Sequence, residues 1–171
     1  VFVATCHKIP FPHFNVALDL GIYQPFSESQ LDAILAFFKQ QDIPKFYLQT
    51  TPLTKPEAAV EWFTQRGMRH VSSWHRIART NAPLAEPLPQ SKHYTVEEIS
   101  AANAEAWADF IDKVYGMPTK TWLLELVGRP GWAHVICRDE TGRITAARSI
   151  KINPDNTAYF CIDAPVPGIM T

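Results

Sequence analysis

Residues 121–167 constrain the fold most strongly, because all the local signals in this stretch agree. Apolar side chains recur at helical spacing between Trp122 and Val127, and Gly128 follows them, which predicts a short helix. Three apolar, β-rich runs come next, separated by clusters of turn-forming residues, and they predict an antiparallel meander. We expect its strands at Trp132–Cys137, Ile144–Ile152 and Ala158–Asp163.

Two capping-box patterns mark helix starts in the first half of the chain. The first precedes an amphipathic helix that should run from Glu28 to about Gln41. The second precedes a shorter helix, which Gly67 is expected to end. The two pairs are Ser27 with Gln30 and Thr54 with Glu57.

Further strands and one more helix complete the predicted elements. Apolar residues at helical spacing predict a helix over Trp107–Val114, and Gly116 ends it. The mixture of helices and strands predicts an α+β fold. The remaining strands are expected at Phe14–Leu20, Phe46–Gln49, Val71–Arg79 and Tyr94–Ile99.

Composition and charge narrow the classes of function. A chain of 171 residues with 46% hydrophobic residues can bury a sizeable core in one domain or in two small ones. The formal net charge of -1 gives no electrostatic reason to expect nucleic acid or a membrane surface as a partner. A small-molecule partner is therefore favoured, and the sequence leaves homo-oligomerisation open.

The cysteines and histidines point to no metal or disulfide framework. Cys6, Cys137 and Cys161 are widely spaced and form no CxxC motif, so we expect free thiols in a reducing cytoplasm. The six histidines lack the spacing of metal ligands, so no metal is expected. No apolar run reaches the ~18 residues of a membrane-spanning helix. The chain begins with Val1, and we expect it to be a piece of a longer protein.

Several segments together resemble the GNAT superfamily of acyl-CoA-dependent N-acetyltransferases. FNVALDLG is similar to the family's cofactor strand, and SESQLDAILAFF is similar to the helix after it. EWFTQRG, VGRPGW and DAPVPG resemble tandem GNAT proteins, in which a degenerate domain precedes a regular one. The resemblance implies a GNAT-like mixed, mostly antiparallel sheet flanked by helices. It divides the chain into the back half of a degenerate domain (1–79), a proline-rich linker (80–93) and the front half of a second domain (94–171).

Two features of the family are missing from the first half. The glycine-rich turn Q/R-x-x-G-x-G/A, which holds the pyrophosphate of the cofactor, is replaced by a turn containing Gly21 and Pro25. Where the family often has a tyrosine that protonates the departing thiolate, this chain has Phe63, which has no proton to give. We therefore expect the first half to be structural, and the chain to be inactive by itself.

The resemblance implies an acetyltransferase that uses acetyl-CoA to acetylate a small amine or an amino-acid-like acceptor. Asp163 is the candidate catalytic base, although a carboxylate at a strand end is more often solvated. Cys161 is more simply a small buried side chain than a nucleophile. Tyr115, Trp122 and Trp132 are the candidates for lining the acceptor site, although aromatic residues at helical spacing are more often core. The implied cofactor-binding residues are Cys161, Ile162, Asp163, Ala164, Pro165 and Val166.

Two further hypotheses accompany this one. The alternative function is a non-catalytic GNAT-like module that binds a ligand or a partner protein, which the missing glycine turn and Phe63 favour. The alternative arrangement is a single permuted sheet that contains both cofactor-like strands, FNVALDL and AYFCID.

Overall fold

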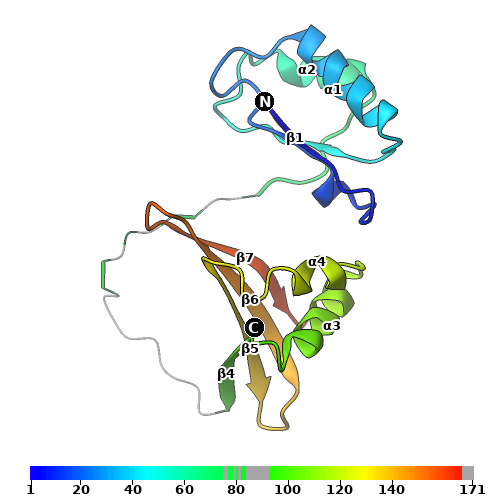
Figure 1. Ribbon diagram of the computed structural model, residues 1–171. Coiled ribbons are helices and arrows are strands. Elements are labelled where there is room, and N and C mark those ends of the chain that lie inside the picture. Colours follow the sequence, from blue (N-terminus) through cyan, green and yellow to red (C-terminus); the bar gives the residue numbers. More distant parts are fainter. Residues whose placement is uncertain (75–76, 79, 81, 84–92, 167–171) are drawn as a thin grey trace. The chain divides into compact units, whose positions relative to one another are not determined.

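The computed structural model describes residues 1–74, 77–78, 80, 82–83 and 93–166, and it confirms the α+β class (Figure 1). The chain forms two compact units, residues 1–82 and 83–171. The division falls inside the predicted linker, most of which lies outside the described residues. Each unit has its own sheet and its own hydrophobic core.

The first unit is built on a three-stranded sheet in the order β1-β2-β3. β1 pairs antiparallel with β2, and β2 pairs parallel with β3. The elements are β1 (Phe2–Ala4), a 3-10 turn (Pro12–Phe14), β2 (Val16–Leu18), α1 (Glu28–Gln40), β3 (Tyr47–Leu48) and α2 (Ala59–Gln65).

Helix α1 is the best-formed element of this unit, and the sequence predicts both of its ends. The Ser27 hydroxyl accepts a hydrogen bond from the backbone N–H of Gln30, and the Gln30 side chain accepts one from the backbone N–H of Ser27. This capping box satisfies two donors that a helix start otherwise leaves unpaired. The apolar face of the helix, with Leu31, Ile34 and Phe38, is buried in the core of the unit.

The second predicted capping box is wrong. Helix α2 begins at Ala59, and its N-cap residue Ala58 offers no side-chain cap. The Thr54 hydroxyl instead accepts from the backbone N–H of Thr51, which closes a turn before the helix. Glu57 forms an exposed ion pair with Lys55. The capping residues are therefore used by the local turn, as the side-chain chemistry of threonine also allows.

Other predicted boundaries in the first unit change for local reasons. The predicted strand Phe14–Leu20 shortens to β2, because the Asn15 side chain fastens the preceding 3-10 turn by donating to the carbonyl of Phe11. Asp19, with φ of 59°, turns the backbone out of the strand. The predicted end of α2 is confirmed, since Gly67 has φ of 76° and follows the last helical turn.

The predicted strand Val71–Arg79 is wrong for the part that the structure describes. Residues 71–74 and 77–78 adopt no regular secondary structure, and the remaining positions lie outside the described residues. Trp74 stacks on His13 with ring centroids 6.1 Å apart, so this segment is held by a ring contact rather than by a strand ladder.

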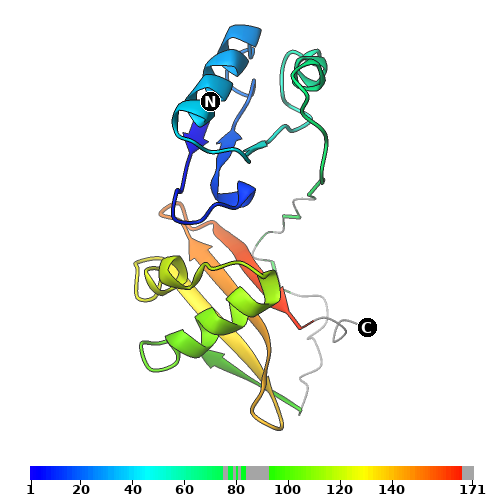
Figure 2. The same ribbon diagram turned by 90° about the vertical axis from the view of Figure 1, so that its right-hand side faces the viewer.

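The second unit contains the predicted meander as a four-stranded antiparallel sheet, in the order β4-β5-β6-β7. Figures 1 and 2 show α3 and α4 together on one face of this sheet. We call this the helix face, and the opposite face the outer face. The elements are β4 (Tyr94–Glu98), α3 (Ala104–Tyr115), α4 (Lys120–Leu124), β5 (Trp132–Asp139), β6 (Ile144–Ile152) and β7 (Ala158–Pro165).

The core of the second unit lies between the helices and the helix face. Trp107 and Ile111 of α3 are almost fully buried, and they pack in one cluster with Ile136 of β5 and Ala147 of β6. Helix α3 ends at Gly116, as predicted, in a left-handed conformation. The apolar residues that recur at helical spacing in the sequence are thus the ones that pack α3 onto the sheet.

Helix α4 is shorter than predicted. The expected helix reached Val127, but α4 ends at Leu124 and a turn carries the chain to β5. The start of α4 is fixed from α3, because one Asp112 carboxylate oxygen accepts from the backbone N–H of Thr119 (2.7 Å) and from its hydroxyl (2.6 Å). A helix capped from outside at its first residue needs less length to be stable.

The hypothesis of one permuted sheet is wrong. The two cofactor-like strands, FNVALDL and AYFCID, correspond to β2 and β7, and these strands belong to separate sheets. Each sheet is completed by strands from its own part of the chain.

Gly21 offers a direct test of the packing in the first unit. Its φ is +66°, and a Cβ at this position would lie 2.1 Å from the carbonyl oxygen of Lys55. We expect Gly21→Ala to lower the free energy of unfolding of this unit by about 2–5 kcal/mol, from backbone strain plus overpacking. The measurement is urea denaturation followed by NMR signals of the first unit.

The matched control is Gly67→Ala. Gly67 also has a positive φ, of +76°, but a Cβ there would meet no atom within 4 Å. Its substitution should therefore cost only the left-handed backbone term of about 1–2 kcal/mol. Equal effects of the two substitutions would contradict the close approach at Gly21.

Candidate functional site

The predicted cofactor strand, β7, contains an irregularity at the centre of the candidate site. Cys161 lies opposite Ser149 and Ala164 lies opposite Ala147, so two residues of β7 face the single residue between them on β6. Ile162, within this β-bulge, has φ of 53°, which is rare for a β-branched residue. A bulge leaves its extra residue outside the ladder, and bulges are frequent beside active sites.

Tyr115 links the bulge to helix α3 by a hydrogen bond. It is the last residue of α3, and its hydroxyl donates a hydrogen bond of 2.5 Å to the backbone carbonyl oxygen of Asp163. Burial raises the pKa of the Tyr115 phenol, and the nearby Asp163 and Cys161 raise it further. The phenol therefore stays protonated at neutral pH and remains a donor toward β7.

The Asp163 carboxylate, our candidate base, is engaged in an ion pair. Arg148 of β6 lies opposite the bulge, and its Nε is 2.5 Å from the Asp163 carboxylate. The Arg148 guanidinium also lies over the Phe160 ring, 5.4 Å from its centroid. One carboxylate oxygen of Asp163 is occupied by this contact, so the geometry favours an ion-pairing role for the side chain over that of a free base.

Cys161 has the surroundings of a structural thiol. It is half-buried, and burial raises its pKa, with a smaller contribution from Asp163. The nucleophilic form of cysteine is the thiolate, which a raised pKa disfavours. His134 lies on β5 and contacts Ser149 of β6, the cross-strand neighbour of Cys161, so Ser149 stands between the histidine and the thiol.

The other predicted cofactor-binding residues divide between core and strand end. Ala164 is fully buried in the core, and Ile162 packs against the same cluster. Pro165 is the last residue of β7, and the backbone N–H of Val166 donates to the carbonyl of Thr145 at 2.8 Å. The bulge is therefore the part of β7 that departs from the regular ladder with β6.

The three predicted acceptor-lining aromatics have different surroundings. Trp122 packs against the core of the second unit. Trp132 stacks on His134 and lies opposite Lys151, three positions along β6 from Arg148. The Tyr115 hydroxyl has a hydrogen bond to the backbone of the bulge. The packing of Trp122 agrees with the core interpretation of that residue, and a substrate-lining role for any of the three stays a prediction.

Sequence reasoning missed Arg148 and the bulge. Arg148 lies within the largely apolar segment AARSIKI. An arginine in such a strand is a signal that a polar partner lies on a neighbouring strand. The bulge has no comparable signal, because Ile162 is a residue type that a regular strand favours.

The turn after β2 has hydrogen bonds of its own where the family would hold a phosphate. Three of its donors are used internally, since the N–H of Phe26 binds the carbonyl of Lys55 and the N–H groups of Ser27 and Gln30 are held in the capping box. Two carboxylates in the first turns of α1, those of Glu28 and Asp32, pair with Arg66. The negative charges of these carboxylates repel a further anion at the start of this helix.

Phe63 lies in the core of the first unit. It packs against the buried cluster there, with its ring centroid 6.2 Å from that of Phe26. This position is consistent with a structural first half, because Phe63 contributes apolar packing where the family often has a hydroxyl.

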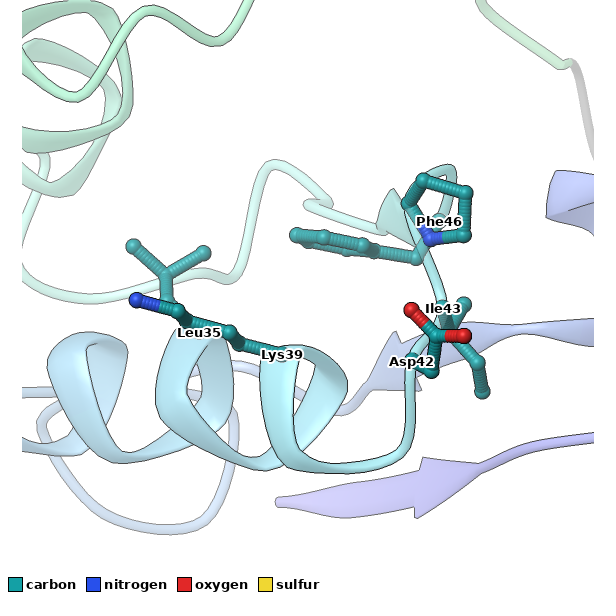
Figure 3. Close-up of a pocket in the computed structure, with 6 residues that line it drawn as sticks. Leu35, Lys39, Asp42, Ile43 and Phe46 are labelled. Atoms are coloured by element: carbon teal, nitrogen blue, oxygen red, sulfur yellow. The ribbon is translucent and has the colours of Figure 1, made fainter.

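A hollow of about 420 Å³ lies on the first unit, at the end of α1 (Figure 3). Its polar side chains, Lys39 and Asp42, are exposed to solvent, and its aromatic wall, Phe46, is stacked on Phe38 at 4.1 Å. Binding sites usually converge several polar groups on an apolar pocket, and this hollow does not. Its lining residues are Leu35, Lys39, Asp42, Ile43, Pro44 and Phe46.

A buried histidine forms the second polar cluster of the second unit. The Nδ1 of His134 is 2.8 Å from the Ser149 hydroxyl, and its Nε2 is 3.4 Å from the carbonyl oxygen of Leu126. Because a carbonyl only accepts, the neutral ring donates from Nε2 and accepts the Ser149 proton at Nδ1. Burial lowers the pKa of His134, and the Leu126 carbonyl opposes this in part. The Trp107 ring lies 4.5 Å away and helps to exclude water.

Within the described ranges, His, Cys, Asp and Glu side chains form no group of three or more that could hold a metal ion. None of the described helices is both long and apolar enough to cross a membrane. Cys6, Cys137 and Cys161 are free thiols.

The burial of His134 makes the second unit sensitive to acid. Its folded pKa lies below the ordinary value of 6.5, so between these two values the unfolded chain binds the proton and the folded one does not. We expect the free energy of unfolding to fall as the pH drops below about 6.5, by at most about 1.4 kcal/mol per pH unit. Urea denaturation at several pH values, followed by indole NMR signals of Trp107 and Trp132, measures this slope.

His134→Gln should be less stable at neutral pH and should lose this part of the slope. The control is His93→Gln, which removes an exposed histidine from the same unit and should keep the slope. A His134→Gln variant with the slope of the unmodified chain would assign the acid sensitivity to other groups.

Comparisons with known proteins assign no family to this chain. It matches no model of a protein family, and no curated protein matches it. The resemblance to the GNAT superfamily is thus a prediction from the residues, and the function has to be argued from the geometry around β7.

Proposed function

We propose that the chain is an acetyl-CoA-dependent N-acetyltransferase, or a segment of one, that acts on a small amine or an amino-acid-like acceptor. The observation that supports this proposal is the bulge in β7, because it interrupts the ladder in the strand that the resemblance assigns to the cofactor. Backbone N–H groups that leave a ladder can donate to a thioester carbonyl.

The proposed chemistry is direct transfer. The acceptor amine, once deprotonated, attacks the thioester carbonyl, and a backbone N–H of the bulge stabilises the oxyanion. The C–S bond then breaks, the nitrogen releases one proton as the amide forms, and the departing thiolate takes up a proton from solvent, so that the products are the acetylated amine and the free thiol. Tyr115 positions the bulge through the Asp163 carbonyl, and in this proposal Asp163 contributes through its backbone more than through its paired carboxylate.

The second candidate function, a non-catalytic interaction module, is favoured by other observations. The Asp163 carboxylate is held by Arg148, and the helix start in the first unit carries carboxylates where a pyrophosphate would bind. A cytoplasmic location is proposed for either function, and it rests on the three free thiols.

Titration of the chain with acetyl-CoA by calorimetry separates the two functions. The acetyltransferase proposal expects binding, without turnover by this chain alone. No heat of binding at millimolar acetyl-CoA would contradict it and would favour the interaction module.

Tyr115→Phe tests whether the cofactor uses the bulge. The substitution removes the hydrogen bond to the Asp163 carbonyl, so we expect acetyl-CoA affinity to fall by roughly two- to tenfold. The matched control is Tyr94→Phe, which removes a hydroxyl from a partly exposed tyrosine on β4. Binding that is unchanged in Tyr115→Phe would place the cofactor elsewhere.

A further inference from the structure

Three polar side chains lie in one row across the helix face of the second unit. His134 of β5 pairs with Ser149 of β6, and Ser149 pairs with Cys161 of β7. Side chains directly opposite each other on neighbouring strands point to the same face, with Cβ atoms about 4.5–5.5 Å apart. The row therefore leads from the buried histidine to Cys161, the residue directly before Ile162 of the bulge.

The histidine end of this row is enclosed by the core of the unit. Ser149 is fully buried and His134 is 2% exposed. The Trp107 ring of α3 lies against the histidine, and its indole N–H has no hydrogen-bond partner in the described part of the chain. Because an indole N–H only donates, it cannot receive a proton from Ser149. Any rearrangement of the hydroxyl proton therefore has to use the other members of the row.

With a neutral histidine, the hydrogen bond in the row runs from Ser149 to His134. The ring donates from Nε2 to the Leu126 carbonyl, 3.4 Å away, and its Nδ1 accepts the Ser149 proton over 2.8 Å. A hydroxyl has one proton to donate. The Cys161 sulfur therefore receives no hydrogen bond from Ser149 in this state.

A proton added to His134 reverses this hydrogen bond. Both nitrogens of an imidazolium are donors, so Nδ1 then donates to the Ser149 oxygen. The hydroxyl proton of Ser149 has to turn away from the ring toward another acceptor. The sulfur of Cys161 is the next acceptor along the row, since a thiol sulfur accepts hydrogen bonds weakly.

We propose that His134 and Ser149 form a pH-dependent switch beside the bulge, in which protonation of His134 turns the Ser149 hydroxyl from the ring to the Cys161 sulfur. The step takes one proton from solvent to Nδ1 and rotates one hydroxyl, and no bond between heavy atoms forms or breaks. Burial lowers the pKa of His134, so the transition lies below pH 6.5.

Other ionisable side chains near the row are engaged elsewhere or lie farther along the strands. Glu97 and Arg138 pair with each other, and Lys151 donates to the Pro130 carbonyl. The shift in the pKa of His134 comes from burial and from the Leu126 carbonyl. The ionisable groups that face the helix side from β4, β5, β6, β7 and the end of α3 are Glu97, Arg138, Lys151, Tyr159, Cys161 and Tyr115.

NMR titration of the full chain between about pH 4.5 and 8 is the first measurement. The imidazole nitrogen shifts give the tautomer and the midpoint of His134, and the Cβ shifts of Ser149 and Cys161 report on the row. We expect the proton on Nε2 at neutral pH, and a shift of both Cβ signals with the midpoint of His134. Titration of the thiol itself falls outside this range, because burial raises the pKa of Cys161.

Ser149→Ala removes the hydroxyl that connects the two ends of the row. His134 should still take up a proton in this variant, and the Cys161 signal should lose its transition. An effect of a titrating carboxylate, such as that of Asp163 on the outer face, would survive the substitution. The loss is therefore specific to the hydroxyl.

The matched control is Thr145→Val, which removes another buried hydroxyl from β6, one that donates to the Cys137 carbonyl at 3.2 Å. The Cys161 transition should persist in this control. His134→Gln is the second variant, and it should abolish the transition because glutamine does not titrate. Circular dichroism at each pH checks that the three variants remain folded.

Several results would overturn the inference. They are a proton on Nδ1 of His134 at neutral pH, a Cys161 signal that does not follow His134, and a Cys161 transition that persists in Ser149→Ala. Unfolding of the second unit before His134 takes up a proton would also overturn it, because the switch requires a folded acid state. These measurements contain no acetyl-CoA, so their outcome is independent of the acetyltransferase proposal.

Discussion

Side chains of a strand alternate between the two faces of a sheet, and in the described part of the second unit the helices α3 and α4 cover one of these faces. The core depends on this one-sided packing, because Trp107 and Ile111 press against alternate residues of β5 and β6. The candidate site depends on it as well, since Tyr115 can reach β7 only where α3 ends over the sheet. The same packing points the other set of alternate residues away from these helices.

The sequence predicted the elements that local chemistry determines. The capping box of α1, the three strands of the meander and the glycine that ends α3 each follow from neighbouring residues, and the structure confirms them. The failed boundaries depend on contacts that are more distant along the chain. α4 is shorter than its apolar spacing suggests, and Asp112 of the preceding helix caps its start. Thr54 resembles a cap, but a competing turn with Thr51 uses its hydroxyl.

The candidate site was predictable in location and not in chemistry. The family resemblance directed attention to β7, and Tyr115, Cys161 and Asp163 do lie together there. The role of Asp163 changed because its partner, Arg148, comes from another strand, and pairing across a sheet depends on register. The bulge shifts the register between β6 and β7, and no turn-forming residue in the sequence indicates its position. In the first unit, the single glycine of the turn after β2 has a packing reason, the close approach of Lys55, so its presence is not a sign of phosphate binding.

The bulge in β7 also shifts the phase of the alternation along this strand. Cys161 and Ala164 are three positions apart, so a regular strand would point them to opposite faces, yet they lie opposite Ser149 and Ala147, which share one face. The bulge thus absorbs the extra residue, so that both ends of β7 present their side chains to the correct faces. Deleting one of the two bulge residues would leave Cys161 and Ala164 two positions apart, so a regular strand would keep both on the helix face and Phe160 on the opposite face. A one-residue deletion at the bulge is therefore expected to keep the two faces of β7 while removing the irregularity on which the proposed function rests.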